Sequence, residues 1–206
     1  MFANMKMKFR LVVTDTKTGK PIRRTRWRNS HSFVIQFLQM LQGSMEHAYA
    51  GTNSYAMTDT GNTSRTVAIG INSGVHYSGY HWSLNAPVDG DTYGIVVGTD
   101  NTAETNTDYV LGTQIADGSG AGQLDYSSHT WTDAAEVGAN VDMYVQRPFI
   151  NNSGGGITIE ETGIYVTVQD SGATQRYFCI VRDTTGGVTV NDGQTCTVEY
   201  LFRTTV

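Results

Sequence analysis

Residues 141–204, "VDMYVQRPFINNSGGGITIEETGIYVTVQDSGATQRYFCIVRDTTGGVTVNDGQTCTVEYLFRT", decide the fold. Runs rich in Val, Ile, Thr, Tyr and Phe alternate here with the turn clusters "NNSGGG", "QDSGAT", "RDTTGG" and "VNDGQ". Short runs of this kind, separated by turn residues, predict antiparallel strands. Two earlier runs, "YGIVVG" (93–98) and "GQLDYSSHTW" (122–131), continue the pattern. We therefore predict a mainly β protein, with a jelly-roll-like antiparallel β-sandwich as its body over 93–206.

The composition supports this fold class. Charged residues make up 16% of the 206 residues, below the usual ~25%, and the 23 glycines exceed the usual ~7%. Such a mixture is typical of short strands joined by many turns. The length fits one domain. We expect residues 1–45 to belong to one continuous domain with 93–206. The long polar and aromatic stretch 46–92 predicts an extended loop or arm that can include short strands, and loops of this length are normally functional or disordered.

Charge is distributed unevenly along the chain. Nine of the 14 Lys and Arg residues lie before residue 29, where Asp15 is the one opposing acid. Residues 1–28 therefore carry a formal charge of +8 and the remainder −13, which together give the net charge of −5. A split of this kind indicates an end of the protein that meets an acidic partner.

The basic end has the pattern of a β-hairpin over 6–28. "MKMKFRLVV" (5–13) alternates apolar and basic residues, "TDTKTGKP" supplies turn residues, and "IRRTRWR" (22–28) returns as a second strand. This pattern predicts a cationic face made of Lys6, Lys8, Arg10, Arg24, Arg26 and Arg28. We expect residues 1–45 to act as a docking element; the alternative is a solvated strand face that discourages edge pairing.

One helix is predicted, within "NSHSFVIQFLQMLQGSM" (29–45). Ser30 or Ser32 can cap its start and Gly43 can end it. An apolar stripe that includes Phe33 and Phe37 should be buried. The other face carries Gln36, Gln39 and Gln42, which a neighbouring subunit could cover at modest desolvation cost; the alternative is a helix laid on its own sheet.

The region 46–92 contains an aromatic group, Tyr77, Tyr80, His81 and Trp82. Side chains of this kind could stack on sugars, so a glycan or receptor contact is one interpretation. The alternative is that they pack the loop onto the sandwich or onto a neighbouring subunit.

The spacing of the remaining candidates argues against a catalytic or cofactor site. Gly118, Gly120 and Gly122 fit neither a phosphate loop nor a dinucleotide loop, and we predict that they give backbone freedom in a connecting loop. Glu160 and Glu161 are adjacent on a strand, so they point to opposite faces and cannot flank one bond; we expect both in solvent.

The acidic residues of 89–108 could supply oxygen ligands to a structural calcium ion, although the EF-hand spacing is absent. These residues are Asp89, Asp91, Asp100, Glu104 and Asp108. We otherwise expect no metal and no cofactor. Cys179 and Cys196 favour two buried free thiols, with a cross-strand disulfide as the alternative.

We expect no targeting signal in this sequence. Lysines interrupt the apolar residues of "MFANMKMKFRLVV" (1–13), so we expect no signal peptide, and no run approaches the length of a membrane span. We expect a protein made in a cytosol that has no membrane partner.

Four segments of the chain resemble a group of tailed-bacteriophage virion structural proteins. They are "DTKTGKPIRRTRWRNSHSFVIQFLQML" (15–41), "IVVGTDNTAETNTDYVLGTQIADGSGAGQLDY" (95–126), "RPFINNSGGGITIEETGIYV" (147–166) and "FCIVRDTTGGVTVNDGQTCTVEYLFRTTV" (178–206). Their order is similar to the opening hairpin, helix, central block and closing hairpin of that group. Residues 46–90 depart from the group's pattern.

The resemblance implies a β-sandwich protein of the virion that is assembled in the host cytoplasm. It implies no active site, and it implies other virion proteins as partners, namely capsid, portal or tail subunits, together with further copies of the chain. A capsid decoration or vertex-associated protein is the expected role, with a tail, neck or baseplate component as the alternative. A nucleic-acid partner is not expected, because the rest of the chain is acidic and base-stacking aromatics are scarce beside the cations.

Overall fold

A computed structural model describes residues 4–30, 33–46, 54–68 and 81–205. The predicted fold class is confirmed: the chain is mainly β, its sheets are antiparallel and consistent with a β-sandwich, and these described residues contain one short helix. The elements are β1 (Asn4–Asp15), β2 (Pro21–Arg24), β3 (Arg28–Asn29), α1 (Ile35–Glu46), β4 (Ser54–Thr58), β5 (Ser64–Ala68), β6 (Gly94–Gly98), β7 (Asp125–Tyr126), β8 (Thr130–Val137), β9 (Asn140–Ile150), β10 (Ile157–Gln169), β11 (Gln175–Val190) and β12 (Gln194–Thr205).

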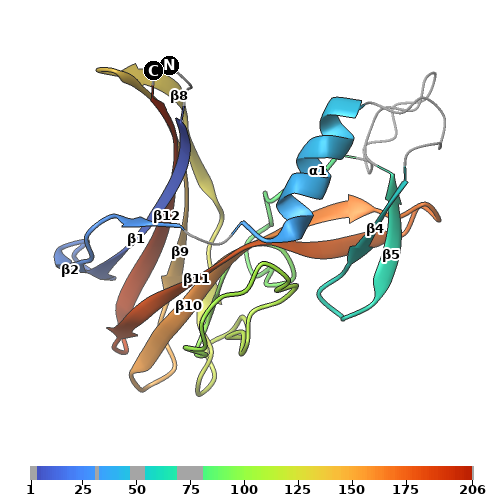
Figure 1. Ribbon diagram of the computed structural model, residues 1–206. Helices are drawn as coiled ribbons and strands as arrows, with labels where there is room; N and C mark the ends of the chain where they lie inside the picture. The colour runs from blue at the N-terminus through green and yellow to red at the C-terminus, as the bar shows by residue number, and fades with distance from the viewer. Residues whose placement is uncertain (1–3, 31–32, 47–53, 69–80, 206) are drawn as a thin grey trace.

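The larger sheet has seven strands. Its order is β2-β1-β12-β9-β7, with β3 also paired to β1 and β8 also paired to β9. The first and last strands of the chain, β1 and β12, pair along their whole length from Asn4↔Thr205 to Asp15↔Gln194. Both ends of the chain therefore lie together at one end of this sheet (Figure 1).

The smaller sheet has the order β11-β10-β6. The 13 residues of β10 and the 16 of β11 run from beneath the larger sheet, past α1, to the β4–β5 hairpin (Figure 1). Ser83 extends this sheet by exchanging two main-chain hydrogen bonds with Thr167 of β10. Because β10 and β11 lie in this sheet and β9 and β12 in the larger one, the chain crosses between the two sheets twice from β9 to β12.

The core lies between the two sheets and follows from strand alternation. Met7, Phe9, Leu11 and Val13 are each at most 2% exposed, as the alternation in β1 predicts. Their partners across β12 are Phe202, Tyr200, Val198 and Cys196, which share the inner face. Cys179 and Cys196 are both buried free thiols, so the disulfide alternative is wrong.

The helix differs from its prediction at both ends. It begins at Ile35, and Ser30 does not cap it: Ser30 instead donates its hydroxyl to the Asp183 carboxylate. Ser32 lies outside the described residues. Gly43 does not end the helix, which continues to Glu46. Phe33 precedes the helix and forms a bridge to Val181 of β11, and this contact places α1 on the smaller sheet.

The described part of region 46–92 is folded onto the body. Strands β4 and β5 form a two-stranded sheet. The amide of Ser171 donates to the carbonyl of Thr66, and the amide of Thr60 donates to the carbonyl of Tyr177, so both bonds join this hairpin to the β10–β11 end. These contacts hold the β4–β5 hairpin to the body. The extended loop or arm over 46–92 stays a prediction, because residues 47–53 and 69–80 lie outside the described residues.

Candidate interaction surfaces

The six basic residues predicted to form one cationic face are divided by the register of the sheet. Arg24 lies opposite Val12 on the outer face, whereas Arg28 lies opposite Phe9, whose side chain enters the core. The prediction that Arg24, Arg26 and Arg28 share one side is therefore wrong. Arg28 donates to the carbonyl of Thr185 on β11.

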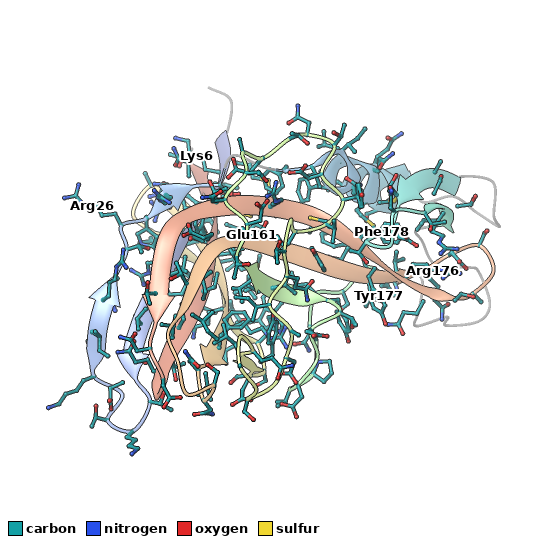
Figure 2. All side chains as sticks on the ribbon, turned by 90° about the horizontal axis from the view of Figure 1, so that it is seen from below. Lys6, Arg26, Glu161, Arg176, Tyr177 and Phe178 are labelled. Atoms are coloured by element: carbon teal, nitrogen blue, oxygen red, sulfur yellow. The ribbon has the colours of Figure 1, made fainter. Side chains whose placement is uncertain are left out.

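The other basic residues of this group remain on the outside of the larger sheet. Lys6, Lys8 and Arg10 lie on the outer face of β1, because the residues between them are buried. Arg10 pairs with Glu199 at 2.5 Å, and its guanidinium carbon lies 4.3 Å from the centre of the Trp27 ring. Arg26 points away from the ribbon and is exposed (Figure 2).

The glutamines of α1 do not form an open face. Gln36 is 2% exposed and its amide donates to the carbonyl of Thr58, while the amide of Gln39 donates to the carbonyl of Ala56. Both bonds reach β4, so the alternative interpretation, a helix laid on its own sheet, describes these two residues. Gln42 lies on the exposed side of the helix.

Apolar residues occupy the exposed face of α1 instead. Ile35, Leu38 and Met45 are 51%, 62% and 73% exposed. Leu38 and Met45 lie three and four residues from Leu41, so they adjoin it on the helix surface. Leu41 itself lines an apolar cleft, which makes the exposed helix face continuous with that cleft.

The apolar cleft has a volume of about 390 Å³ and opens between the larger sheet and α1. Its lining is rich in large side chains, including Met5, Phe33, Phe37, Trp82, Trp131 and Phe202. Met5 and Trp131 at its rim are 57% and 45% exposed. Exposed apolar surface of this kind marks sites of contact with a partner.

The aromatic group of region 46–92 is described only in part. Tyr77 and Tyr80 lie outside the described residues. Trp82 packs against the core and its indole donates to the hydroxyl of Ser44 at 3.1 Å, whereas His81 is exposed. Trp82 therefore joins the loop to the helix, which agrees with the packing alternative.

Strand β8 is the surface that the sequence did not predict. It pairs with β9, and all eight of its residues, "TWTDAAEV", are exposed. It is an edge strand of the larger sheet, because β9, its partner, is paired with β12 on the other side. The sequence signal was the turn "VGANV" (137–141), in which Gly138 has a φ of 63°.

The buried charges of the body have structural partners. Arg182 donates to Glu161, Asp108 and Asp100 at 2.9, 2.9 and 3.0 Å, which pins the segment 99–113 against β10 and β11. Glu161 is fully buried and also accepts the amides of Gly112 and Thr113 (Figure 2 labels its position). The expectation of a solvent-facing Glu161 is therefore wrong.

Four of the five acidic residues considered for calcium are engaged in similar contacts, namely Asp91, Asp100, Glu104 and Asp108. Burial raises the pKa of Asp108, but hydrogen bonds from Thr105 and Arg182 outweigh it and leave that pKa lowered. Asp91 accepts the amide of Asp117, and Glu104 accepts the amide of Thr184. Within the described ranges, no group of three or more His, Cys, Asp or Glu side chains is arranged to hold a metal ion.

A second buried arginine, Arg147, has no carboxylate partner among the described residues. Its guanidinium donates to five main-chain carbonyls, those of Ser127, Tyr93, Ile95, Pro87 and Gly90. Burial lowers its pKa to about 10. Nearby, His129 accepts the Ile95 amide and contacts the Ala86 carbonyl, and burial followed by the charge of Arg147 lowers its pKa to about 4.

The glycine-rich segment 117–124 is a closed loop. The amide of Gly118 donates to the carbonyl of Leu124, and the amide of Leu124 donates to that of Ala116. Gly118 and Gly122 have φ values of 135° and 78°, which agrees with the predicted backbone freedom. A Cβ at Gly120 would lie 2.5 Å from the side-chain oxygen of Gln123. The Gln123 side chain therefore packs against the backbone of residue 120 at a distance that only glycine allows.

No helix in the described part of the chain is long and apolar enough to cross a membrane. Comparison of the chain with protein-family models, with curated proteins and with solved structures gave no match.

Proposed function

We propose that the chain is a non-enzymatic structural component of a tailed-bacteriophage particle, namely a capsid decoration or vertex-associated protein. The resemblance of four sequence segments to virion proteins suggests the setting. The observation that carries the proposal is edge strand β8, because all eight of its residues are exposed and it pairs with β9 on one side only in the described part of the chain. An edge strand presents unpaired main-chain donors and acceptors, so a partner that covers β8 would satisfy them.

The exposed apolar surface supports the same proposal. The cleft and the adjoining face of α1 present Leu38, Met45, Met5 and Trp131 to solvent. Surfaces of this kind become buried when subunits assemble.

The buried polar groups support a non-enzymatic role. Glu161, Arg182 and His129 are each committed to hydrogen bonds inside the body. Burial strongly raises the pKa of the Cys179 thiol and raises that of Cys196 to about 12, which disfavours the thiolate forms needed for nucleophilic chemistry.

Two alternatives belong to the same proposal. A tail, neck or baseplate position would use the same surfaces with a different copy number. A glycan-binding role receives less support, because Trp82 is packed on α1 and His81 is the exposed member of the described aromatic group.

The test is the protein content of purified particles. Density-gradient-purified virions are digested, and peptides of this chain are quantified by mass spectrometry against the major capsid protein. We expect a fixed stoichiometry: on the order of hundreds of copies for decoration, or a small number set by local symmetry for a vertex, neck or baseplate position. Absence of the chain from infectious particles would overturn the proposal.

A further inference from the structure

The two edges of the seven-stranded sheet differ in charge. One edge is β8, which pairs with β9 on one side only. The other edge is formed by β1 with the short strands β2 and β3. An edge strand presents unpaired main-chain donors and acceptors, so each edge can accept a further strand.

The β8 edge is acidic. It carries Asp133 and Glu136, both exposed, and neither forms an ion pair within the described residues. The sequence contains no Lys or Arg between Arg65 and Arg147, so no basic residue from this stretch offsets those charges.

The β1 edge is basic and partly open. In the described part of the chain, no strand pairs with residues 4–7 of β1 on the side away from β12. The main-chain contact on that side is one hydrogen bond, from the Ser30 amide to the Met7 carbonyl. A groove of about 540 Å³ follows this stretch and is lined by Met5, Lys6, Met7 and Lys8 with Asn29 and Phe33. Lys6 and the more distant Arg26 are both exposed (Figure 2).

We infer that these two edges bind each other between copies: β8 of one copy docks along the basic β1 edge of the next. This inference rests on the proposed function, which calls for many copies, and it names the contact that joins them. Addition of a strand would satisfy main-chain groups on both edges, and the opposite charges would fix the orientation.

The open stretch of β1 can pair with about half of β8. Residues 4–7 span roughly 13 Å at about 3.3 Å per residue, whereas the eight residues of β8 span roughly 26 Å, and residues 8 and 9 of β1 are already paired with β3. Pro21 removes a main-chain donor from β2, so strand addition applies to the open part of β1 and not to β2.

The contact is head-to-tail because it joins different surfaces. Contacts of this type close into rings or continue as filaments, and they do not stop at a two-fold dimer. A symmetric β8–β8 contact would bring Asp133 and Glu136 of both copies together, and like charges in this position repel.

The experiment exchanges the charges of the two edges. The first variant carries Asp133→Lys and Glu136→Lys, so both of its edges are basic. The second carries Lys6→Glu and Arg26→Glu, so its β1 edge becomes acidic like β8. All four side chains are exposed, which leaves the core of each variant intact. Sedimentation velocity at low salt measures the association of the wild type, of each variant and of an equimolar mixture.

We expect the wild type to form species larger than a dimer that dissociate as salt is added. The association constant of each variant alone should be lower than that of the wild type by a factor of roughly ten or more. The mixture should recover association, because the β8 edge of each variant then meets an oppositely charged β1 edge on the other. A control with Ser119→Lys and Ala121→Lys, exposed residues of the 117–124 loop, should behave as the wild type.

Three results would overturn the inference: a monomeric wild type at low salt, unchanged association of the second variant, or a mixture that stays monomeric. Unchanged association of the second variant, together with loss in the first, would indicate a symmetric contact through β8. If the protein is found in particles while the isolated chain stays monomeric, the inference fails and the proposed function stands.

Discussion

Charged side chains in the interior of the sandwich have partners within the chain, whereas those at the edges of the larger sheet are exposed to solvent. In the interior, Arg182 contacts three carboxylates and Arg147 contacts five carbonyls. At the edges, Asp133, Glu136, Lys6 and Arg26 are exposed and form no ion pair within the described residues. The interior charges therefore contribute to folding of the single chain, whereas the edge charges are available to other molecules.

The largest effect is expected at Arg147. Arg147→Met fills a similar volume but removes one hydrogen-bond donor from each of five carbonyls, and unpaired buried polar groups are costly. We expect the free energy of unfolding to fall by about 3 to 5 kcal/mol, measured by urea denaturation. Arg147→Lys should fall between the wild type and Arg147→Met, because it keeps the charge but not the fork of donors. Wild-type stability of Arg147→Met would show that the carbonyls find other donors.

The second effect is expected at Glu161. Glu161→Gln removes the charge that Arg182 faces and replaces one acceptor oxygen by a donor, beside the amides of Gly112 and Thr113. We expect a loss of about 2 to 3 kcal/mol and faster proteolysis within segment 99–113. Glu160→Gln is the matched control, since Glu160 is partly exposed on the opposite face; its stability should change by less than about 0.5 kcal/mol. Equal losses in both variants would contradict the assignment of Glu161.

The third effect is a pH dependence set by His129. Its pKa is about 4 in the folded chain, below the ordinary 6.5, so the unfolded chain takes up the proton first as the pH falls. Stability from this group is complete above pH 6.5 and decreases between pH 6.5 and about 4, by at most about 3 kcal/mol. Urea denaturation at roughly pH 7.5 and 4.5 measures this difference.

His129→Gln separates this effect from other titrations. A glutamine can accept the Ile95 amide and does not titrate, so the decrease in stability over this pH range should be smaller in the variant. The acidic groups with lowered pKa values, such as Asp108 and Asp142, act below this range. An identical pH profile in the wild type and the variant would exclude His129 as the source.

The sequence predicted what depends on local alternation. The apolar positions of β1, the turn clusters between the later strands and the existence of the helix all follow from residues near one another in the chain. From these local patterns, both the fold class and the outer position of Lys6, Lys8 and Arg10 could be predicted.

The sequence did not predict features that depend on distant partners. Gln36 is buried because β4, some twenty residues later, covers that side of α1. Glu161 is buried because Arg182 and the segment 99–113 meet it there. Strand β8 has the weak strand formers Asp, Ala and Glu at its centre, so its conformation follows from pairing with β9 and not from its own residues.

The smallest effect on folding is expected at Glu136. A Glu→Gln change here, the same as at Glu161, should weaken association between copies and not the fold of the single chain. Glu136→Gln removes an exposed charge that has no ion pair in the described part of the chain, so the free energy of unfolding of the dilute protein should change by less than about 0.5 kcal/mol. Its association at low salt should weaken, because one charge facing the basic edge is lost. Glu161→Gln should instead destabilise the chain and leave the association of the folded molecules unchanged. Sedimentation of both variants, under conditions in which each is folded, measures this difference. If Glu136→Gln destabilises the isolated chain as Glu161→Gln does, then β8 contributes to the fold of the single copy, and the distinction between interior and edge charges is wrong.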